Sequence, residues 1–354
     1  MTNKRVSVYD WVRLLATVFV IIGHSIYLSN TTNLGGVFYD LPAGVHPIYS
    51  VLVYGVLERL RNWVYDFHMA LFFMLSGAVL ALRPLPSFGR FVTSKAKRLL
   101  LPYFVWGLLF LFPVKMIAGF YDGVSASQLI FDLFTGSESG HLWFLTSLFW
   151  CMVVFWLLRK ATEKIPGIAG DVLLVIITTA VYYTWGRFPF DFLGFKMGLH
   201  YLLFFTTGYV FENVRARLPR IGLLPVAILI AAMAVLEFVH LRHHILGYTS
   251  GIFAGSAFTF LVADLLDRLL PKVPEWPLWK LVQRNLIYVY LFHDPLNYLI
   301  LQAMVPGEIL CSGGGVILYL LMRTLLLFIV CVLLGECVQL LKKKGKILLA
   351  GKEA

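Results

Sequence analysis

The sequence predicts an all-α fold, a polytopic membrane bundle of about ten transmembrane helices. Of its 354 residues, 59% are hydrophobic and 14% are charged, whereas soluble domains carry about 25% charged residues. Apolar runs of roughly 20 residues, long enough to cross a bilayer, recur from one end of the chain to the other. No soluble domain or repeat interrupts them, so we expect residues 1–354 to form a single membrane domain.

The spacing of the apolar runs and the positions of the basic residues predict the topology. If the N-terminus is cytoplasmic, only Arg59, Arg61, Arg187 and Arg242 of the 30 Lys and Arg residues fall in outside loops. Because cytoplasmic loops are enriched in Lys and Arg, both termini are expected in the cytoplasm, and the net charge of +11 reports topology rather than nucleic-acid binding. Long outside loops are expected at 29–64 and 119–140. The predicted spans are 8–28, 65–82, 99–118, 141–158, 168–185, 195–212, 221–240, 247–266, 285–304 and 316–341.

The first span carries a stripe of polar side chains. Arg13 and His24 are eleven residues apart, which places them on one helix face with a rise of roughly 16 Å between them. Asp10 and Thr17 share that face. Ionisable groups in a membrane helix are costly and usually mark function, although a snorkelling arginine and a hydrogen-bonded core histidine are the structural alternative. Histidine is suited to taking a hydroxyl proton near neutral pH.

Polar residues at the predicted outer ends of two spans are candidates for substrate contact. His68 lies near the outer boundary of the second span, ahead of Ser76 and Gly77, whose small side chains permit close helix packing. His141 and Trp143 begin the fourth span, where tryptophan also serves as a general interfacial anchor.

A basic segment precedes the third span. Lys95, Lys97 and Arg98 fit positive-inside anchoring. They also fit a site for an anionic cytoplasmic ligand, because Lys95 and Arg98 are three apart and would share one face of an α-helix.

The ninth span contains a second polar cluster. Tyr290, His293 and Asn297 share one helical face, and Pro295 interrupts the backbone hydrogen bonding. His293 is a candidate for a polar cavity, although a structural role is an open alternative. Asp294 need not face the same way, so the sequence does not define His293 and Asp294 as a pair.

The last span carries Arg323 and Glu336, thirteen residues apart. This spacing prevents them from pairing with each other, so each is expected to meet a partner on another helix. Arg13 is the candidate partner for Glu336.

No metal site is expected. His240, His243 and His244 have the spacing of helical metal ligands, but no cysteine or acidic residue follows them closely. The four cysteines form no C-x-x-C pair, so neither a zinc site nor a disulfide framework is indicated.

Taken together, these segments resemble the acyltransferase type 3 family of integral membrane O-acyltransferases. The resemblance rests on DWVRLLATVFVIIGH (10–24), the LFFMLSG core of 67–82, KAKRLLLPY (95–103), and 141–145 followed by IYVYLFHDPL (287–296). The most specific feature is the Arg-x10-His spacing of the first span. Lys95 stands where the family typically has the first arginine of an Arg-x-x-Arg pair, and lysine loses the bidentate geometry of arginine.

The resemblance implies an O-acyltransferase in a bacterial plasma membrane. The donor would be a cytoplasmic acyl-CoA, usually acetyl-CoA, held by Arg98, Lys95 and Lys97, and the acceptor a hydroxyl of an envelope or exported glycan. His24 would act as general base or carry the acyl group transiently, with Arg13 orienting the thioester or offsetting negative charge. Asp10, His68, His141, Trp143, Tyr290, His293 and Asn297 would bind substrate or support the site. A transporter of a glycan or lipid-linked sugar and a non-catalytic sensor are the alternatives.

Overall fold

The computed structural model describes residues 6–27, 30–32, 35–37, 48–166, 168–219, 221–243, 247–303 and 312–350. Helices dominate these ranges, as predicted. The exception among them is a hairpin of two short antiparallel strands, β1 (Asn30–Thr32) and β2 (Gly35–Val37), in which Asn30 faces Val37.

The described part of the chain contains eight helical segments that are long and apolar enough to cross a membrane, which confirms a multi-pass helical membrane protein. They are Ser7–Ile26, Leu52–Ala81, Phe88–Ile117, Ala126–Thr162, Ile168–Arg187, Leu223–His240, Tyr248–Leu269 and Gly313–Lys344. The predicted span 195–212 is broken at Tyr201 into two shorter helices, and the predicted span 285–304 lies in a helix rich in polar residues. The total of about ten spans and the cytoplasmic position of both termini therefore stay predictions.

Two stretches predicted as outside loops are partly helical. Residues 48–64 belong to α2 (Ile48–Ala81), which begins directly after Pro47 and contains no further proline. Within 119–140 lies α6 (Ala126–Thr135), where the Ser125 hydroxyl accepts the backbone N–H of Gln128 and Gly136 ends the helix in the left-handed conformation. These are ordinary helix start and stop signals, and the long-loop prediction is wrong where these helices lie, at 48–64 and 126–135.

The described helices group into two compact units. Unit 1 comprises Met1–Arg13, Asp66–Pro113 and Gly123–Leu266; unit 2 comprises Leu14–Tyr65, Val114–Asp122 and Asp267–Ala354. The expectation of a single domain across the chain stays a prediction.

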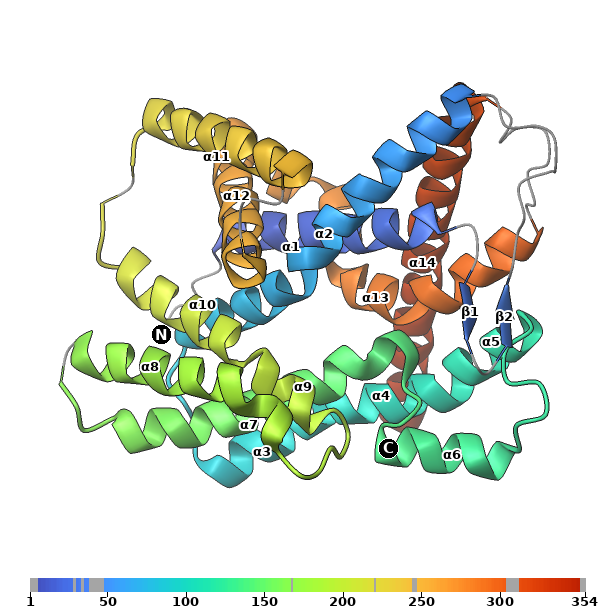
Figure 1. Cartoon of the computed structure of the whole chain (residues 1–354). Coiled ribbons are helices and arrows are strands. Elements are labelled where there is room, and N and C mark those ends of the chain that lie inside the picture. The colour runs from blue at the N-terminus through green and yellow to red at the C-terminus, as the bar shows by residue number, and fades with distance from the viewer. Residues whose placement is uncertain are drawn as a thin grey trace. The chain divides into compact units, whose positions relative to one another are not determined.

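Unit 1 is built mainly from helices of the middle of the chain, the cyan to yellow ribbon in Figure 1. Besides the first turns of α1 (Ser7–Ile26) and the second half of α2, it holds α3 (Phe88–Lys95), the π-helical turn η1 (Ala96–Leu100), α4 (Leu101–Trp106), the π-helical turn η2 (Gly107–Leu111), the start of α5 (Phe112–Ile117), α6, the 3-10 turn η3 (Gly140–Leu142), α7 (Trp143–Thr162), α8 (Ile168–Thr184), the 3-10 turn η4 (Trp185–Arg187), α9 (Phe195–His200), α10 (Leu202–Arg215), α11 (Leu223–His243) and most of α12 (Tyr248–Leu269). The helices α7 and α8 pack against each other.

Two glycines let α2 and α10 cross closely within unit 1. A Cβ atom at Gly77 would lie 1.9 Å from the Phe205 carbonyl oxygen, and one at Gly208 would lie 1.9 Å from the Met74 carbonyl oxygen. Small residues at a crossing let membrane helices pack through their backbones. The packing role expected as one alternative for Gly77 is therefore confirmed.

We expect Gly208→Ala to destabilise the protein, because the added methyl group forces α2 and α10 apart. Overpacking of this kind costs about 1–3 kcal/mol or more. Thermal unfolding in detergent measures the effect, with Gly89→Ala as the control because a Cβ at Gly89 meets nothing within 4 Å. Equal melting temperatures for the two variants would contradict the close crossing.

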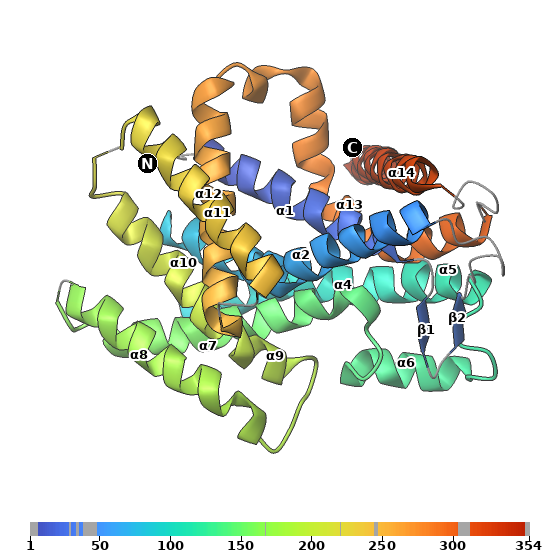
Figure 2. The ribbon, with the colours of Figure 1, turned by 45° about the horizontal axis from the view of Figure 1, so that its top comes forward.

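Unit 2 brings the segment Leu14–Tyr65 together with the C-terminal helices. It contains most of α1, the first half of α2, the hairpin, the end of α5, the 3-10 turn η5 (Val273–Glu275), α13 (Pro277–Ala303) and α14 (Gly313–Ala350). α13 packs against α14, which is the red helix seen almost end-on in Figure 2. Arg284, on α13, makes two charge-assisted hydrogen bonds to the Glu336 carboxylate of α14, at 2.6 and 3.0 Å.

Candidate active site

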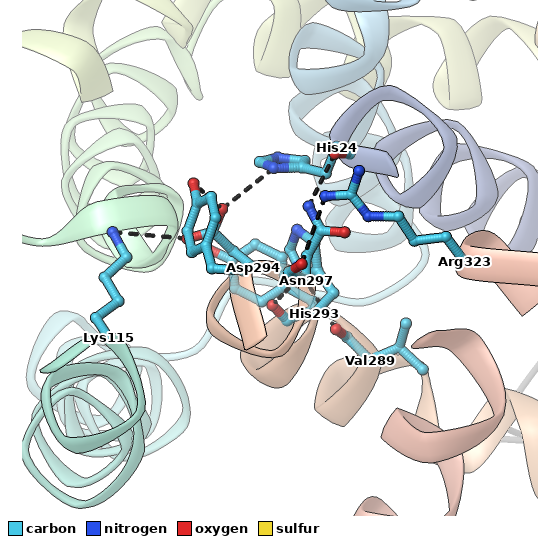
Figure 3. Close-up of polar contacts among 9 residues, drawn as sticks. His24, Lys115, Val289, His293, Asp294, Asn297 and Arg323 are labelled. Carbon is cyan, nitrogen blue, oxygen red and sulfur yellow. Dashed lines mark hydrogen bonds and ion pairs between the residues drawn. The ribbon is translucent and has the colours of Figure 1, made fainter. Parts of the chain in front are cut away.

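His24 and Asp294 form a close polar pair in unit 2 (Figure 3). His24 lies in the last turn of α1, and its Nδ1 is 3.2 Å from Oδ1 of Asp294 on α13. A carboxylate only accepts hydrogen bonds, so Nδ1 is the nitrogen placed to donate to Asp294 and Nε2 is the nitrogen left to accept a proton. The Asp294 side chain is 4% exposed, whereas that of His24 is 19% exposed. The imidazole is therefore oriented from the protein side while part of it stays accessible.

Two further side chains hold the Asp294 carboxylate. The Tyr298 hydroxyl donates to Oδ1 at 3.0 Å, and Lys115 Nζ lies 3.7 Å from Oδ2. Lys115 is itself buried, with its ammonium 5.1 Å from the ring centre of Phe120 and 5.6 Å from that of Tyr298. Buried charges are tolerated when they are paired. The Asp294 carboxylate thus lies between the Lys115 ammonium and the His24 imidazole.

His293 lies beside His24 with a fixed tautomer. Its ring centre is 4.8 Å from that of His24, and the two planes are nearly perpendicular. Its Nδ1 is 2.8 Å from the Tyr290 carbonyl oxygen and 3.1 Å from that of Val289. Carbonyl oxygens only accept, so Nδ1 is the protonated nitrogen. Tyr290 contributes this carbonyl, and its own ring centre lies 6.2 Å from that of His293.

The end of α1 that carries His24 is capped by side chains instead of solvent. The carbonyl oxygens of residues 24–27 all accept hydrogen bonds: the first from Asn297 at 2.8 Å, the third from Tyr54 at 3.1 Å, and the second and fourth from Arg323 at 2.8 and 2.5 Å. The last carbonyls of a helix have no intrahelical partners, and a cation at this end also complements the helix dipole. Arg323 is fully buried, so it and Asn297 fix the backbone of His24.

The structure therefore brings together four of the predicted site residues, which are His24, Tyr290, His293 and Asn297. Sequence reasoning missed Asp294, Lys115 and Arg323 as members of the group. Each is an ionisable residue inside a predicted span, which is itself a signal of function. The sequence does not say which way each of them faces.

Arg13 and Asp10 form their own pair in unit 1. Arg13 Nη1 lies 3.4 Å from Asp10 Oδ1, with side-chain exposures of 38% and 8%. Within unit 2, Glu336 binds Arg284 and accepts a 3.0 Å hydrogen bond from Asn285, and the pairing of Arg13 with Glu336 stays a prediction.

The basic segment before α4 is not the continuous α-helix expected from the sequence, because it contains a π-helical turn. Lys95 ends α3, with its Nζ 5.2 Å from the Phe91 ring centre, and Lys97 and Arg98 are exposed in the π-helical turn Ala96–Leu100. The hydrogen bonds of a π-helix run from i to i+5, and such turns often occur at functional sites. The shared α-helical face expected for Lys95 and Arg98 therefore does not apply here, although exposed cations remain in the segment.

The other predicted contact residues belong to unit 1. His68 is buried within α2, His141 is half-buried in η3, and Trp143 is half-buried at the start of α7. The ring centre of Trp143 lies 5.7 Å from that of Tyr201. Substrate contact by these residues stays a prediction.

The described residues contain no group of three or more His, Cys, Asp or Glu side chains that could hold a metal ion. His240 is buried in α11 and His243 is exposed, while His244 lies outside the described residues.

Unit 2 also contains an apolar cavity of about 400 Å³ between α1, η5, α13 and α14. Its lining contains none of the titratable side chains described above. The lining residues are Leu14, Val18, Ile21, Val273, Trp276, Leu278, Trp279, Val282, Thr324, Leu325 and Phe328.

Comparison with known proteins identifies the family. The chain has no significant match among curated proteins or solved structures. A family model described as an acyltransferase domain, that of the acyltransferase type 3 family, matches residues 7–336. The match runs from the start of α1 to Glu336 in α14 and so includes both members of the His24–Asp294 pair. The chain is therefore a member of the acyltransferase type 3 family of membrane acyltransferases.

Proposed function

We propose that the protein transfers an acyl group, acetyl in the first instance, from cytoplasmic acyl-CoA to a hydroxyl of a cell-envelope or exported glycan. The setting we propose is a bacterial plasma membrane. The single observation that carries the proposal is the 3.2 Å contact between His24 Nδ1 and Asp294 Oδ1. It leaves Nε2 of a partly exposed imidazole as a proton acceptor, which is what activation of a hydroxyl needs.

The chemistry follows from this arrangement. Nε2 of His24 takes the proton of the acceptor hydroxyl as the oxygen attacks the thioester carbonyl, and Asp294 stabilises the imidazolium that forms. When the tetrahedral intermediate collapses, the C–S bond breaks and the imidazolium returns the proton to the departing CoA sulfur. The acceptor gains an ester, CoA leaves as a thiol, and His24 is regenerated.

Arg13 has a different place in this proposal. Arg13 and His24 are separated by a rise of roughly 16 Å along α1, about three helical turns. We therefore assign Arg13 to a part of an extended donor away from the thioester. Arg98, with Lys95 and Lys97, would bind the donor phosphates, since exposed cations suit this anionic group.

The experiment that tests the proposal follows the acyl group itself. Purified protein is incubated with acetyl-CoA labelled in its acetyl group and with a crude extract of cell-surface glycan, and label is counted in the glycan. We expect ester-linked label that mild base releases. Label that stays on CoA with every extract would contradict acyl transfer to a glycan, and movement of an unmodified glycan or lipid-linked sugar across vesicles would establish the transporter alternative.

We expect Arg98→Ala to weaken CoA binding by about tenfold, because charge-assisted hydrogen bonds contribute roughly 1.5–3 kcal/mol. Isothermal titration with CoA measures the change, and Arg217→Ala is the control because Arg217 is likewise an exposed arginine of unit 1. Equal CoA affinity in the two variants would remove Arg98 from the donor site.

A further inference from the structure

Two tyrosine rings lie beside the His24 imidazole. Ring-centre distances are 6.3 Å to Tyr27 and 5.9 Å to Tyr65, and the two tyrosine rings are 6.0 Å apart with their planes at 80°. Gly23 makes room for this arrangement, since a Cβ there would lie 2.5 Å from the Tyr65 ring. Both rings are partly exposed. Together they form an aromatic corner next to the proposed general base.

A guanidinium group covers one side of this corner. Arg61 lies one turn before Tyr65 on α2, and its Cζ is 4.8 Å from the Tyr27 ring centre. Its Nε and Nη2 donate to Asn62 Oδ1 at 3.2 and 3.0 Å, which fixes the plane of the group. The Arg61 side chain is 17% exposed, and its carboxylate neighbour Glu58 is 3.6 Å away and 43% exposed. Exposed carboxylates neutralise a cation only weakly.

The cation is also unusual for its position in the sequence. Arg61 is one of the few Lys and Arg residues expected on the outer side of the membrane, so positive-inside topology does not account for it. A mostly buried, oriented guanidinium held close to a general base has the features of a ligand for a carboxylate or phosphate, which arginine binds in bidentate fashion.

We propose that Tyr27, Tyr65 and Arg61 form the acceptor subsite, and that the acceptor sugar is anionic. The apolar C–H faces of the sugar pack on the tyrosine rings, Arg61 binds its carboxylate or phosphate, and the hydroxyl to be acylated lies at His24. This inference rests on the proposed function. It adds a substrate class, because an anionic sugar gives Arg61 a counter-charge in addition to the exposed Glu58, and a neutral sugar does not.

Equilibrium binding to the purified full-length protein tests the subsite without relying on turnover. The probes are the methyl glycosides of glucuronic acid and of glucose, and glucose 6-phosphate. We expect wild type to bind an anionic probe at least tenfold more tightly than the neutral glycoside; the carboxylate and phosphate arms distinguish the two sources of charge. Arg61→Gln should abolish that preference, while Arg59→Gln, which alters an exposed arginine of the same helix, should keep it.

Tyr27→Ala should weaken the binding of the neutral and the anionic probes by similar factors, because it removes a stacking surface and leaves Arg61 in place. Equal affinity of wild type for the charged and neutral probes, absence of binding to the anionic probes, or a preference that survives Arg61→Gln would overturn the subsite. Thiol release from acetyl-CoA is measured separately. Its absence would count against acyl transfer, whereas a charge preference that depends on Arg61 would still support the subsite.

Discussion

His24→Gln is expected to abolish acyl transfer while leaving the donor bound. Glutamine keeps a polar side chain of similar length but has no group that can accept and return a proton near neutral pH. General base catalysis by a positioned side chain contributes about 10²–10⁴-fold, so turnover should fall by at least this factor. Initial rates with acetyl-CoA and glycan measure the loss, and titration with CoA measures donor affinity.

His243→Gln is the matched control for this variant, because His243 is an exposed histidine of α11 in unit 1. It should retain wild-type rates. A His24→Gln protein that is folded and still turns over at the control rate would remove His24 from the chemistry.

Asp294→Asn is expected to cause the second largest loss, about 10²–10⁴-fold in kcat. The amide is nearly isosteric, but its NH₂ group can face Nδ1 and select the tautomer that places the proton on Nε2, so the base loses its lone pair. The neutral amide also fails to stabilise the imidazolium and leaves Lys115 without its 3.7 Å counter-charge.

The control for the loss of a carboxylate is Asp122→Asn, in an exposed position of the loop after α5. The pH dependence of kcat distinguishes a role of Asp294 in orienting His24 from an effect on the titration of His24 alone. If Asp294 acts through His24, kcat of Asp294→Asn should stay low across the pH range in which wild type is active. Recovery of wild-type kcat at higher pH would indicate that Asp294 only shifts the titration of His24.

Much of this site is visible in the sequence because helix periodicity is local. The spacing of Arg13 and His24, and the shared face of His293 and Asn297, follow from 100° per residue alone. The resemblance to the family adds the order of the segments. What periodicity cannot supply is the rotation of α13 against α1. Asp294 lies about 100° from His293 around the helix, and only the packed structure shows that it meets His24.

The partners of Arg323 and Glu336 could be identified only from the tertiary structure, for the same reason. Arg323 is 298 positions from Ser25, whose carbonyl it caps, and nothing in either segment marks the pair. The register of α13 against α14 gives Glu336 the partners Arg284 and Asn285, which the sequence did not suggest. By contrast, the missed helix α6 had local signals in Ser125, Gln128 and Gly136.

The measurement that tests the central claim most directly is the release of free thiol from acetyl-CoA by purified wild type and His24→Gln, each with and without cell-surface glycan. The account predicts release by wild type that depends on the glycan and disappears in the variant. Wild-type release that is the same without glycan, or glycan-dependent release that persists in His24→Gln, would contradict the assignment of His24 as the base that activates the acceptor hydroxyl.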